Sequence, residues 1–281
     1  LHPPVLAEGA ASLLPGQLRP ALVWEIGFDQ TGATTSIQVA RASVRSRRQW
    51  SYPEAQEALD AGSDEEQLVL LREVGLLRLQ QEAARGGVSL PVPEQEVVAT
   101  GRSWQLDFRA LLPIETWNAQ LSLATGMAAA RIMLDGGVGI LRTLPPARDS
   151  GLAKLRRTAA ALGIRWPHSL DYPGFVRSLD PANPRHAAML NACTLLFRGA
   201  GYAAFDGEAP AQPEHAAIAA PYAHCTAPLR RLVDRYAGEI CVALCAGVPV
   251  PEWVSEALPS LPGEMDDSNR RARKDERGIV D

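Results

Sequence analysis

The first 112 residues show a period-two pattern of apolar and polar positions that predicts two β-hairpins. In each, two alternating runs flank a short turn that contains a glycine, Asp29-Gln30-Thr31-Gly32 in the first and Thr100-Gly101-Arg102 in the second. Glycine in a tight turn between alternating runs is typical of antiparallel strands. The four strands are expected over residues 21–28, 36–44, 94–99 and 103–111.

Helical spacing of apolar residues dominates the rest of the chain. Ser63 and Glu66 have the form of a capping box at the start of a helix. A run rich in alanine and glycine from Ile114 to Leu134 predicts a long, closely packed central helix. Ser150 is expected to cap a later helix, and residues 163–184 to form a Pro-rich loop. Helices are expected over residues 53–61, 63–85, 114–134, 150–162, 185–197, 226 onwards, 249–258 and 262–276, and short strands over 138–143 and 199–205.

These patterns predict an α+β fold. A β-hairpin-rich first part with two helices is expected over residues 1–112, and a mainly helical second part over residues 113–281. A content of 46% hydrophobic and 21% charged residues is ordinary for a soluble globular protein. The net charge of −4 provides no overall positive field. Any binding of nucleic acid therefore requires a local basic groove.

The cysteines and the apolar runs indicate where in the cell the protein is expected. The four cysteines have no spacing typical of metal ligands, which favours a reducing environment. No apolar run has the length of a membrane span, and no signal peptide is recognised. The chain is therefore expected to be cytoplasmic, with no membrane partner.

A stretch near the end of the chain combines the features of a helix start with two arginines. Thr226 has a side chain suited to a helix N-cap, and Pro228 suits the first helical turn. Arg230 and Arg231 follow where a helix N-terminus already carries partial positive charge, so the stretch predicts a site for an anion such as phosphate. Alternatively both arginines are solvated, and Asp234 forms a weak ion pair with Arg230 four residues before it.

This stretch, residues 222–234, reads Y-A-H-C-T-A-P-L-R-R-L-V-D and is called the signature segment below. It resembles the Y-x-H-F-T-S-P-I-R-R-Y-x-D signature of the RNB domain, the nuclease core of the ribonuclease II and ribonuclease R family. Seven of the eleven specified positions match without a gap. Residues 6–19 resemble a second family segment, L-S-E-x-x-x-S-L-x-P-x-x-x-R. The resemblance implies that most of the chain is the latter part of an RNB-type nuclease domain.

The family hydrolyses single-stranded RNA from the 3′ end to nucleoside 5′-monophosphates with Mg²⁺, and the resemblance implies the same activity here. Arg230 matches the arginine that stabilises charge on the phosphate in the transition state, a role that needs a fixed guanidinium. Tyr52 occupies the tyrosine of the family's R-L-x-Y segment. Together with Thr226 and Arg231 it is expected to position the RNA. The alternative for Tyr52 is packing on the following helix.

Further RNA contacts are implied at four positions. Tyr222 and His224 belong to the signature segment, His215 begins H-A-A-I-A, which resembles the family's H-F-G-L-A, and Arg142 begins R-T-L, which resembles R-x-H. A lone histidine is equally a hydrogen-bonded structural residue, and Arg142 is equally a solvated strand end. A basic cluster with aromatics also precedes the first helix, in a composition that suits an RNA backbone or a solvated strand end. Its members are Arg45, Arg47, Arg48, Trp50 and Tyr52.

Several family features are altered. Gln120 stands at the second of two family glutamates, Gly126 stands where the family has asparagine, and Leu90 stands near the position of an aromatic clamp. Mg²⁺ requires hard oxygen ligands, which the family provides in a D-x-x-x-x-x-D-x-D-D segment that precedes the point where this sequence begins. Metal ligands are therefore expected from a missing N-terminal part of the same domain, and none is assigned in this chain.

Three functions follow from these observations. The favoured one is the RNA-binding and catalytic-arginine portion of a metal-dependent 3′→5′ exoribonuclease, incomplete for catalysis by itself. The alternative is a catalytically inactive RNA-binding module that lacks the metal-binding aspartates. A cysteine hydrolase built on Cys225 and His224 is disfavoured, because adjacent side chains rarely point at each other.

Overall fold

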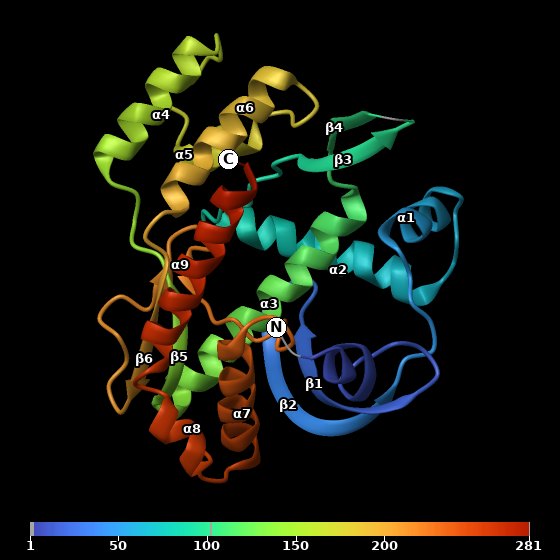
Figure 1. Cartoon of the computed structure of the whole chain (residues 1–281). Coiled ribbons are helices and arrows are strands. Elements are labelled where there is room, and N and C mark those ends of the chain that lie inside the picture. Colours follow the sequence, from blue (N-terminus) through green and yellow to red (C-terminus); the bar gives the residue numbers. More distant parts are fainter. Residues whose placement is uncertain (1–2, 102, 281) are drawn as a thin grey trace.

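The computed structural model describes residues 3–101 and 103–280, with side chains at all of these except 95, 96, 106, 273 and 275–280. Helix α3 (Pro113–Gly136) runs through the middle of the molecule, and the other elements are arranged around it (Figure 1). Small, buried residues along α3, among them Ala128 and Ala129, let its neighbours approach closely. The predicted central helix and the α+β fold are confirmed.

The first hairpin, β1 (Leu18–Phe28) and β2 (Thr34–Arg45), is antiparallel and matches the prediction. Its turn is held by Asp29, whose carboxylate accepts hydrogen bonds from the backbone N–H groups of Thr31 at 2.8 Å and Ala33 at 3.0 Å. Gly32 adopts a positive φ of 79° there, a conformation that glycine accepts without strain.

The second hairpin, β3 (Glu94–Thr100) and β4 (Ser103–Arg109), is also antiparallel. Arg102, part of the expected turn, lies outside the described residues. The described side chains on one face of this hairpin are apolar and largely exposed, with Trp104 at 73% and Phe108 at 59%.

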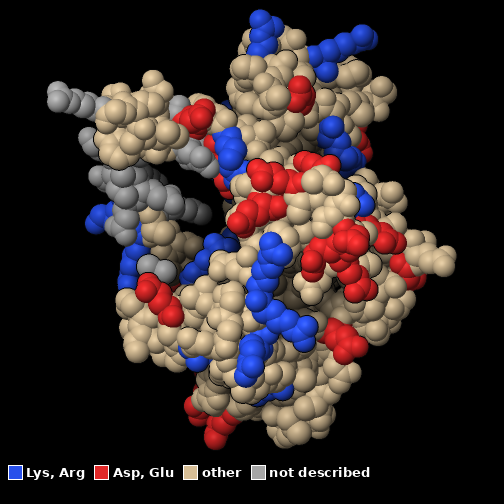
Figure 2. All heavy atoms as spheres, turned by 90° about the vertical axis from the view of Figure 1, so that its right-hand side faces the viewer, with Lys and Arg blue, Asp and Glu red and all other residues tan. Residues whose placement is uncertain are grey.

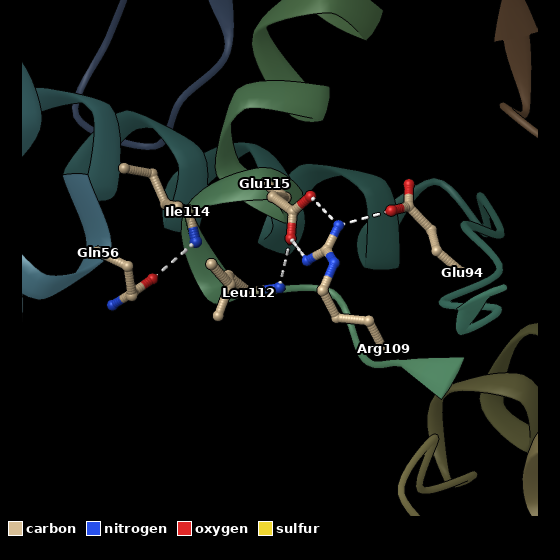
Figure 3. A network of polar contacts seen from close by, with 6 residues as sticks. All are labelled: Gln56, Glu94, Arg109, Leu112, Ile114 and Glu115. Carbon is tan, nitrogen blue, oxygen red and sulfur yellow. Dashed lines mark hydrogen bonds and ion pairs between the residues drawn. The ribbon is translucent and has the colours of Figure 1, made fainter. Parts of the chain in front are cut away.

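A polar network fixes the base of this hairpin to the start of α3 (Figure 3). The Arg109 guanidinium donates to both carboxylate oxygens of Glu115, at 2.6 and 3.0 Å, and to Glu94 across the hairpin at 2.5 Å. Gln56 of the neighbouring helix accepts a hydrogen bond from the Ile114 N–H at 3.1 Å. Hairpin, first helix and central helix therefore meet at one point.

Two helices between the hairpins agree with the expected ranges, but the capping box is one helix earlier than predicted. α1 (Tyr52–Asp60) begins with a capping box formed by Ser51 and Glu54. α2 (Glu66–Ala84) has no side-chain cap, and Ser63 instead accepts from the N–H of Glu65 at 3.2 Å.

Around the second half of α3 lies the largest apolar cluster. Strands β5 (Val138–Thr143) and β6 (Gly201–Asp206) pair antiparallel. Helices α7 (Leu232–Ala246), α8 (Glu252–Ala257) and α9 (Leu261–Val280) complete the layer, and α9 crosses β6 (Figure 1). Cluster members with at most 1% exposure include Ala129, Met133, Ile140, Val233, Ile240 and Leu261.

A second apolar cluster joins α4 (Asp149–Ala161), α5 (Tyr172–Arg177) and α6 (Pro184–Cys193), which a 3₁₀ turn (Thr194–Phe197) follows. Two predictions were wrong here. α4 starts at Asp149 without a side-chain cap, so Ser150 lies inside the helix. The expected loop contains α5, because Asp171 accepts from the Gly174 N–H at 2.8 Å and starts a helical turn.

Three short elements remain: a π-helical turn (Val5–Ala10) and the two-residue strands β7 (Glu214–His215) and β8 (Ala220–Pro221). Among the described residues, no helix combines the length and the apolar character needed to cross a membrane.

Candidate nucleic-acid interface

The signature segment starts against α3, at a helix position that only glycine fits. The N–H of Ala223 donates to the Gly126 carbonyl at 3.0 Å. A Cβ at position 126 would lie 2.1 Å from Cε2 of Tyr222 and 2.6 Å from the Ala223 carbonyl oxygen. Gly126, a departure from the family asparagine, therefore lets the Tyr222 ring pack directly on the helix.

The helix that follows the signature segment begins later than predicted. α7 starts at Leu232 rather than at Thr226, and Arg231 is in the N-cap position with extended backbone. Thr226 caps no helix, and its hydroxyl accepts a hydrogen bond from Ser122 of α3 at 3.1 Å. Residues 227–231 form a turn in which the N–H groups of Arg230 and Arg231 bond to the Ala227 carbonyl.

Asp234 organises this turn. Its buried carboxylate accepts from the Ala227 N–H at 2.7 Å and from two nitrogens of Arg231, each at 2.8 Å. Charge-assisted bonds to both oxygens fix a guanidinium in one orientation. The ion pair of Asp234 is therefore with Arg231 and not, as the sequence suggested, with Arg230. Arg230 is exposed, and no described side chain pairs with it.

Tyr202 of β6, which the sequence did not single out, connects the signature segment to Arg142. Its hydroxyl lies 2.7 Å from Nδ1 of His224. The Arg142 guanidinium carbon lies 4.6 Å from the centre of the Tyr202 ring, a cation–π contact. Arg142 ends up beside the segment because its N–H donates to the Tyr222 carbonyl at 2.8 Å. Tyr202 precedes the signature segment by 20 residues and belongs to none of the motifs recognised in the sequence.

Two buried polar atoms near Tyr222 have no protein partner. They are Nη1 of Arg142 and Nδ1 of His215. The His215 ring contacts the Tyr222 ring edge-on at 6.1 Å, and the Tyr222 ring contacts that of His224 at 5.6 Å. Buried polar atoms are normally paired, so these two stand out as lacking a hydrogen-bond partner in a group otherwise held by protein contacts. The structure thus brings together Arg142, His215, Tyr222, His224 and Arg231.

The electrostatics of this group favour an anion. Burial, followed by the charges of Arg231 and Arg142, lowers the pKa of His224 to about 3. Burial and Arg142 lower the pKa of His215 to about 4. Both imidazoles are therefore neutral at pH 7, while the guanidiniums, including Arg230, remain charged. Among the described residues, the carboxylates of Asp234 and Asp266 act on Tyr202, so the three guanidiniums of Arg142, Arg230 and Arg231 leave positive charge in excess, as phosphate binding requires.

Tyr52 and Thr226 lie along one face of α3. The Tyr52 hydroxyl accepts from Nδ2 of Asn118 at 2.9 Å, and Thr226 accepts from Ser122. Residues four apart on a helix are neighbours on the same face. We call Asn118 and Ser122 the polar row. Tyr52 is 43% exposed, so part of its surface is accessible to a ligand and the rest is covered by the protein.

Two other expectations change with the structure. Gln120, considered as a substitute for a family carboxylate, is buried, and its Nε2 donates to Glu82 of α2 at 2.6 Å. It therefore faces away from the signature segment. Leu90 packs on the second apolar cluster.

Cys225 does not have the properties of a nucleophile. Burial raises the pKa of its thiol to about 12, whereas the reactive form is the thiolate. Its neighbour His224 has Nδ1 directed at Tyr202. The geometry gives no support to a cysteine hydrolase.

The acidic, histidine and cysteine side chains do not gather into a metal site in the described residues. Within the described parts of the chain, no three His, Cys, Asp or Glu residues are grouped so that they could hold a metal ion. These residues therefore do not fit a bound Mg²⁺.

The model of the RNB domain family matches residues 1–245. The chain belongs to the RNB family. A ribonuclease of Synechocystis sp. (strain ATCC 27184 / PCC 6803 / Kazusa), named as uncharacterized, is 26% identical over 142 residues, which cover 50% of this chain and 21% of that protein.

Solved structures agree on the RNB fold. Ribonuclease R of Mycoplasma genitalium, in complex with ribose-methylated single-stranded RNA, superimposes with a TM-score of 0.81 at 20% identity, over 98% of this chain and 45% of that one. Yeast Ssd1, described as a pseudonuclease, gives a TM-score of 0.70 at 17% identity, over 92% and 33%. This chain spans less than half the length of each of these three relatives.

Proposed function

We propose that this chain is the RNA-holding, arginine-bearing part of a cytoplasmic 3′→5′ exoribonuclease that converts single-stranded RNA to nucleoside 5′-monophosphates. The single observation that carries the proposal is the group around His224. There, charged guanidiniums, neutral histidines and two unpartnered buried polar atoms lie next to the exposed Arg230. Membership of a ribonuclease family and the fold of ribonuclease R support it.

Each residue has a role in this proposal. Arg230, exposed at the turn before α7, neutralises charge on the phosphate oxygens as the phosphodiester bond is broken. Arg231, held by Asp234, fixes the neighbouring backbone phosphate. If the Tyr202 hydroxyl donates to Nδ1 of His224, the proton of this neutral ring is on Nε2. That nitrogen is then a hydrogen-bond donor for RNA.

We propose that the whole enzyme uses Mg²⁺, with ligands that the described residues do not include. Mg²⁺ would supply Lewis-acid activation of the phosphate and the attacking water. The described residues do not provide its ligands, so the proposal places those ligands elsewhere in the RNB domain. The chain by itself is expected to bind RNA without cutting it.

Binding is tested by fluorescence anisotropy with labelled single-stranded RNA. Arg230→Ala is expected to weaken binding by about 10-fold, because one charge-assisted contact contributes about 1.5 kcal/mol. Arg235→Ala, an exposed arginine one turn along α7, is the matched control and should change affinity less than about twofold. A wild-type chain that does not bind RNA would refute the proposal.

The catalytically inactive RNA-binding module is the second candidate. It is favoured by the lack of a metal-binding group among the described residues and by the likeness to a pseudonuclease fold. The aspartate-bearing segment of an RNB relative can be fused ahead of residue 1 to separate the two. With Mg²⁺ and 5′-labelled RNA, shortening from the 3′ end that disappears in Arg230→Ala supports the enzyme. Intact RNA that still binds supports the inactive module.

A further inference from the structure

A strip of exposed arginines lies outside the group around His224. Arg45 ends β2, and Arg47 and Arg48 lie in the extended segment before α1. None of the three forms an ion pair with another described residue. Figure 2 shows Lys and Arg side chains in a continuous run on the face that carries α1, with acidic side chains beside it. We call Arg45, Arg47 and Arg48 the basic strip.

The end of the basic strip is held in place by an aromatic ring. The guanidinium carbon of Arg48 lies 3.3 Å from the centre of the Trp50 ring, and Trp50 is half-buried against the apolar cluster of α1 and α2. The carboxylate of Glu54, whose pKa is lowered by Ser51 and also by Arg48, is engaged in the α1 cap through hydrogen bonds from Ser51 at 2.7 and 2.9 Å. The strip thus retains positive charge for an external anion.

Two side-chain contacts on α3 connect the end of the basic strip with the signature segment. Tyr52, four residues after Arg48, touches the first member of the polar row, Asn118, and the second member, Ser122, touches Thr226. Four residues of α-helix advance by about 6 Å. The exposed Tyr52 ring and the polar row therefore bridge the strip and Thr226 over a short distance along α3.

We propose that the basic strip binds the backbone phosphates of the same RNA strand whose 3′ part lies at the signature segment. The proposal rests on the proposed function and adds a second site that recognises phosphate alone. Phosphate contacts hold a strand without reading its sequence. Positive charge combined with an exposed aromatic ring, here Tyr52, is the usual composition of a surface that binds single strands.

Oligonucleotide length tests this proposal. Anisotropy is measured with a short, 4-nucleotide strand, which reaches the signature segment only, and a 16-nucleotide strand, which also reaches the strip. The variant is the combination of Arg45→Ala, Arg47→Ala and Arg48→Ala. The control combines Arg157→Ala, Arg165→Ala and Arg198→Ala, three exposed arginines on other elements that change the net charge equally.

For the 16-nucleotide strand, the logarithm of the binding constant falls linearly with the logarithm of the salt concentration. Losing three phosphate contacts should reduce the steepness of this line by about 2. The wild-type affinity should therefore fall about 20-fold further than that of the strip variant between 50 and 200 mM salt. The 4-nucleotide strand should bind both equally, and the control should behave as wild type.

Equal losses for both lengths, or a salt dependence that matches the control, would overturn the second site while leaving the proposed function intact. If the wild-type chain binds neither strand, the proposed function fails, and the second site fails with it. Binding of the long strand that depends on the strip alone, with no effect of Arg230→Ala, would contradict the proposed function.

Discussion

The two ends of the proposed RNA path hold their arginines in opposite ways. In the signature segment, Arg231 is fixed by both oxygens of the buried Asp234 carboxylate. In the basic strip, Arg45 and Arg47 have no ion-pair partner among the described residues. A preorganised guanidinium acts without reorganisation, whereas a free one adapts to its ligand and loses side-chain entropy on binding. The first arrangement suits positioning near the reacting bond, and the second suits holding charge.

The largest effect on stability is expected from removing the Asp234 carboxylate, which fixes Arg231 in the signature segment. Asp234→Ala leaves Arg231 half-buried without its partner and removes the acceptor of the Ala227 N–H. Loss of one member of such a buried pair costs about 3 kcal/mol, which urea unfolding would measure. Asp267→Ala removes the exposed ion pair with Arg270 and should cost less than about 1 kcal/mol. Equal costs would show that Asp234 does not organise the turn.

Filling the contact between α3 and the signature segment should have the next largest effect. Gly126→Ala places a Cβ against the Tyr222 ring and the Ala223 carbonyl, so the segment must move. Overpacking of this kind costs about 1–3 kcal/mol, and RNA affinity should fall with it. Gly263→Ala, in α9 with open space around it, is the control and should be neutral or slightly stabilising. Unfolding curves and anisotropy measure both.

Low pH should reduce the free energy of unfolding, because the buried histidines of the signature segment and its surroundings are neutral in the folded chain. The pKa of His224 is about 3 in the folded chain and about 6.5 in an unfolded one. Below pH 6.5 the unfolded state therefore binds more protons, and stability falls as the pH falls. We expect His224 to account for about 1–2 kcal/mol of the loss between pH 6.5 and 5.

The histidine contribution is isolated by comparing thermal unfolding of wild type and His224→Asn across this pH range. The variant should show a shallower decline. His168→Asn, which changes an exposed side chain, should reproduce the wild-type profile. A variant profile parallel to wild type would exclude a buried neutral His224.

Tyr202 provides a finer test, because its ring and its hydroxyl have separate partners. Tyr202→Phe loses the hydrogen bond to His224 and keeps the ring under Arg142, at a cost of about 1 kcal/mol. Tyr202→Leu also loses the cation–π contact. Double-mutant cycles with Arg142→Ala should give a coupling energy for the leucine variant and almost none for the phenylalanine variant. The reverse pattern would mean that the ring does not hold Arg142.

The smallest effect on stability is expected at Tyr52, beside the basic strip. Tyr52→Ala removes a partly exposed side chain whose hydroxyl accepts one hydrogen bond from Asn118, so the free energy of unfolding should change by less than about 1 kcal/mol. RNA affinity should nevertheless fall by about 1–3 kcal/mol if a base stacks on the ring. Tyr52→Phe is the control and should retain the affinity. Loss of stability without loss of affinity would assign Tyr52 to packing alone.

Local patterns in the sequence predicted most of the elements. Both hairpins and the central helix were recognised, because glycine turns and periodic apolar residues act over a few positions. The start of α7 was misplaced by six residues. Thr226 is a good local cap, but its hydroxyl is used by Ser122 and the Ala227 N–H is used by Asp234. Contacts between distant segments decided the outcome.

Some residues of the candidate site were predicted from the sequence, and others became visible only in the structure. The family resemblance located the signature segment, Arg142 and His215, and the structure brings these together. Tyr202 and the polar row were not identified, since their relevance arises from positions 22 and 104 residues away in the chain. A single tyrosine or serine carries no local signal for such a role.

The second apolar cluster has a consequence for how the molecule moves. It joins α4, α5 and α6 and contains no residue of the signature segment or the basic strip. Proteins open in cooperative units that follow such divisions of their packing. We therefore expect the lobe formed by these helices to unfold locally without disturbing the packing of α3 on α7. Amide hydrogens of α4 and α6 should then exchange at rates different from those of α3 and α7.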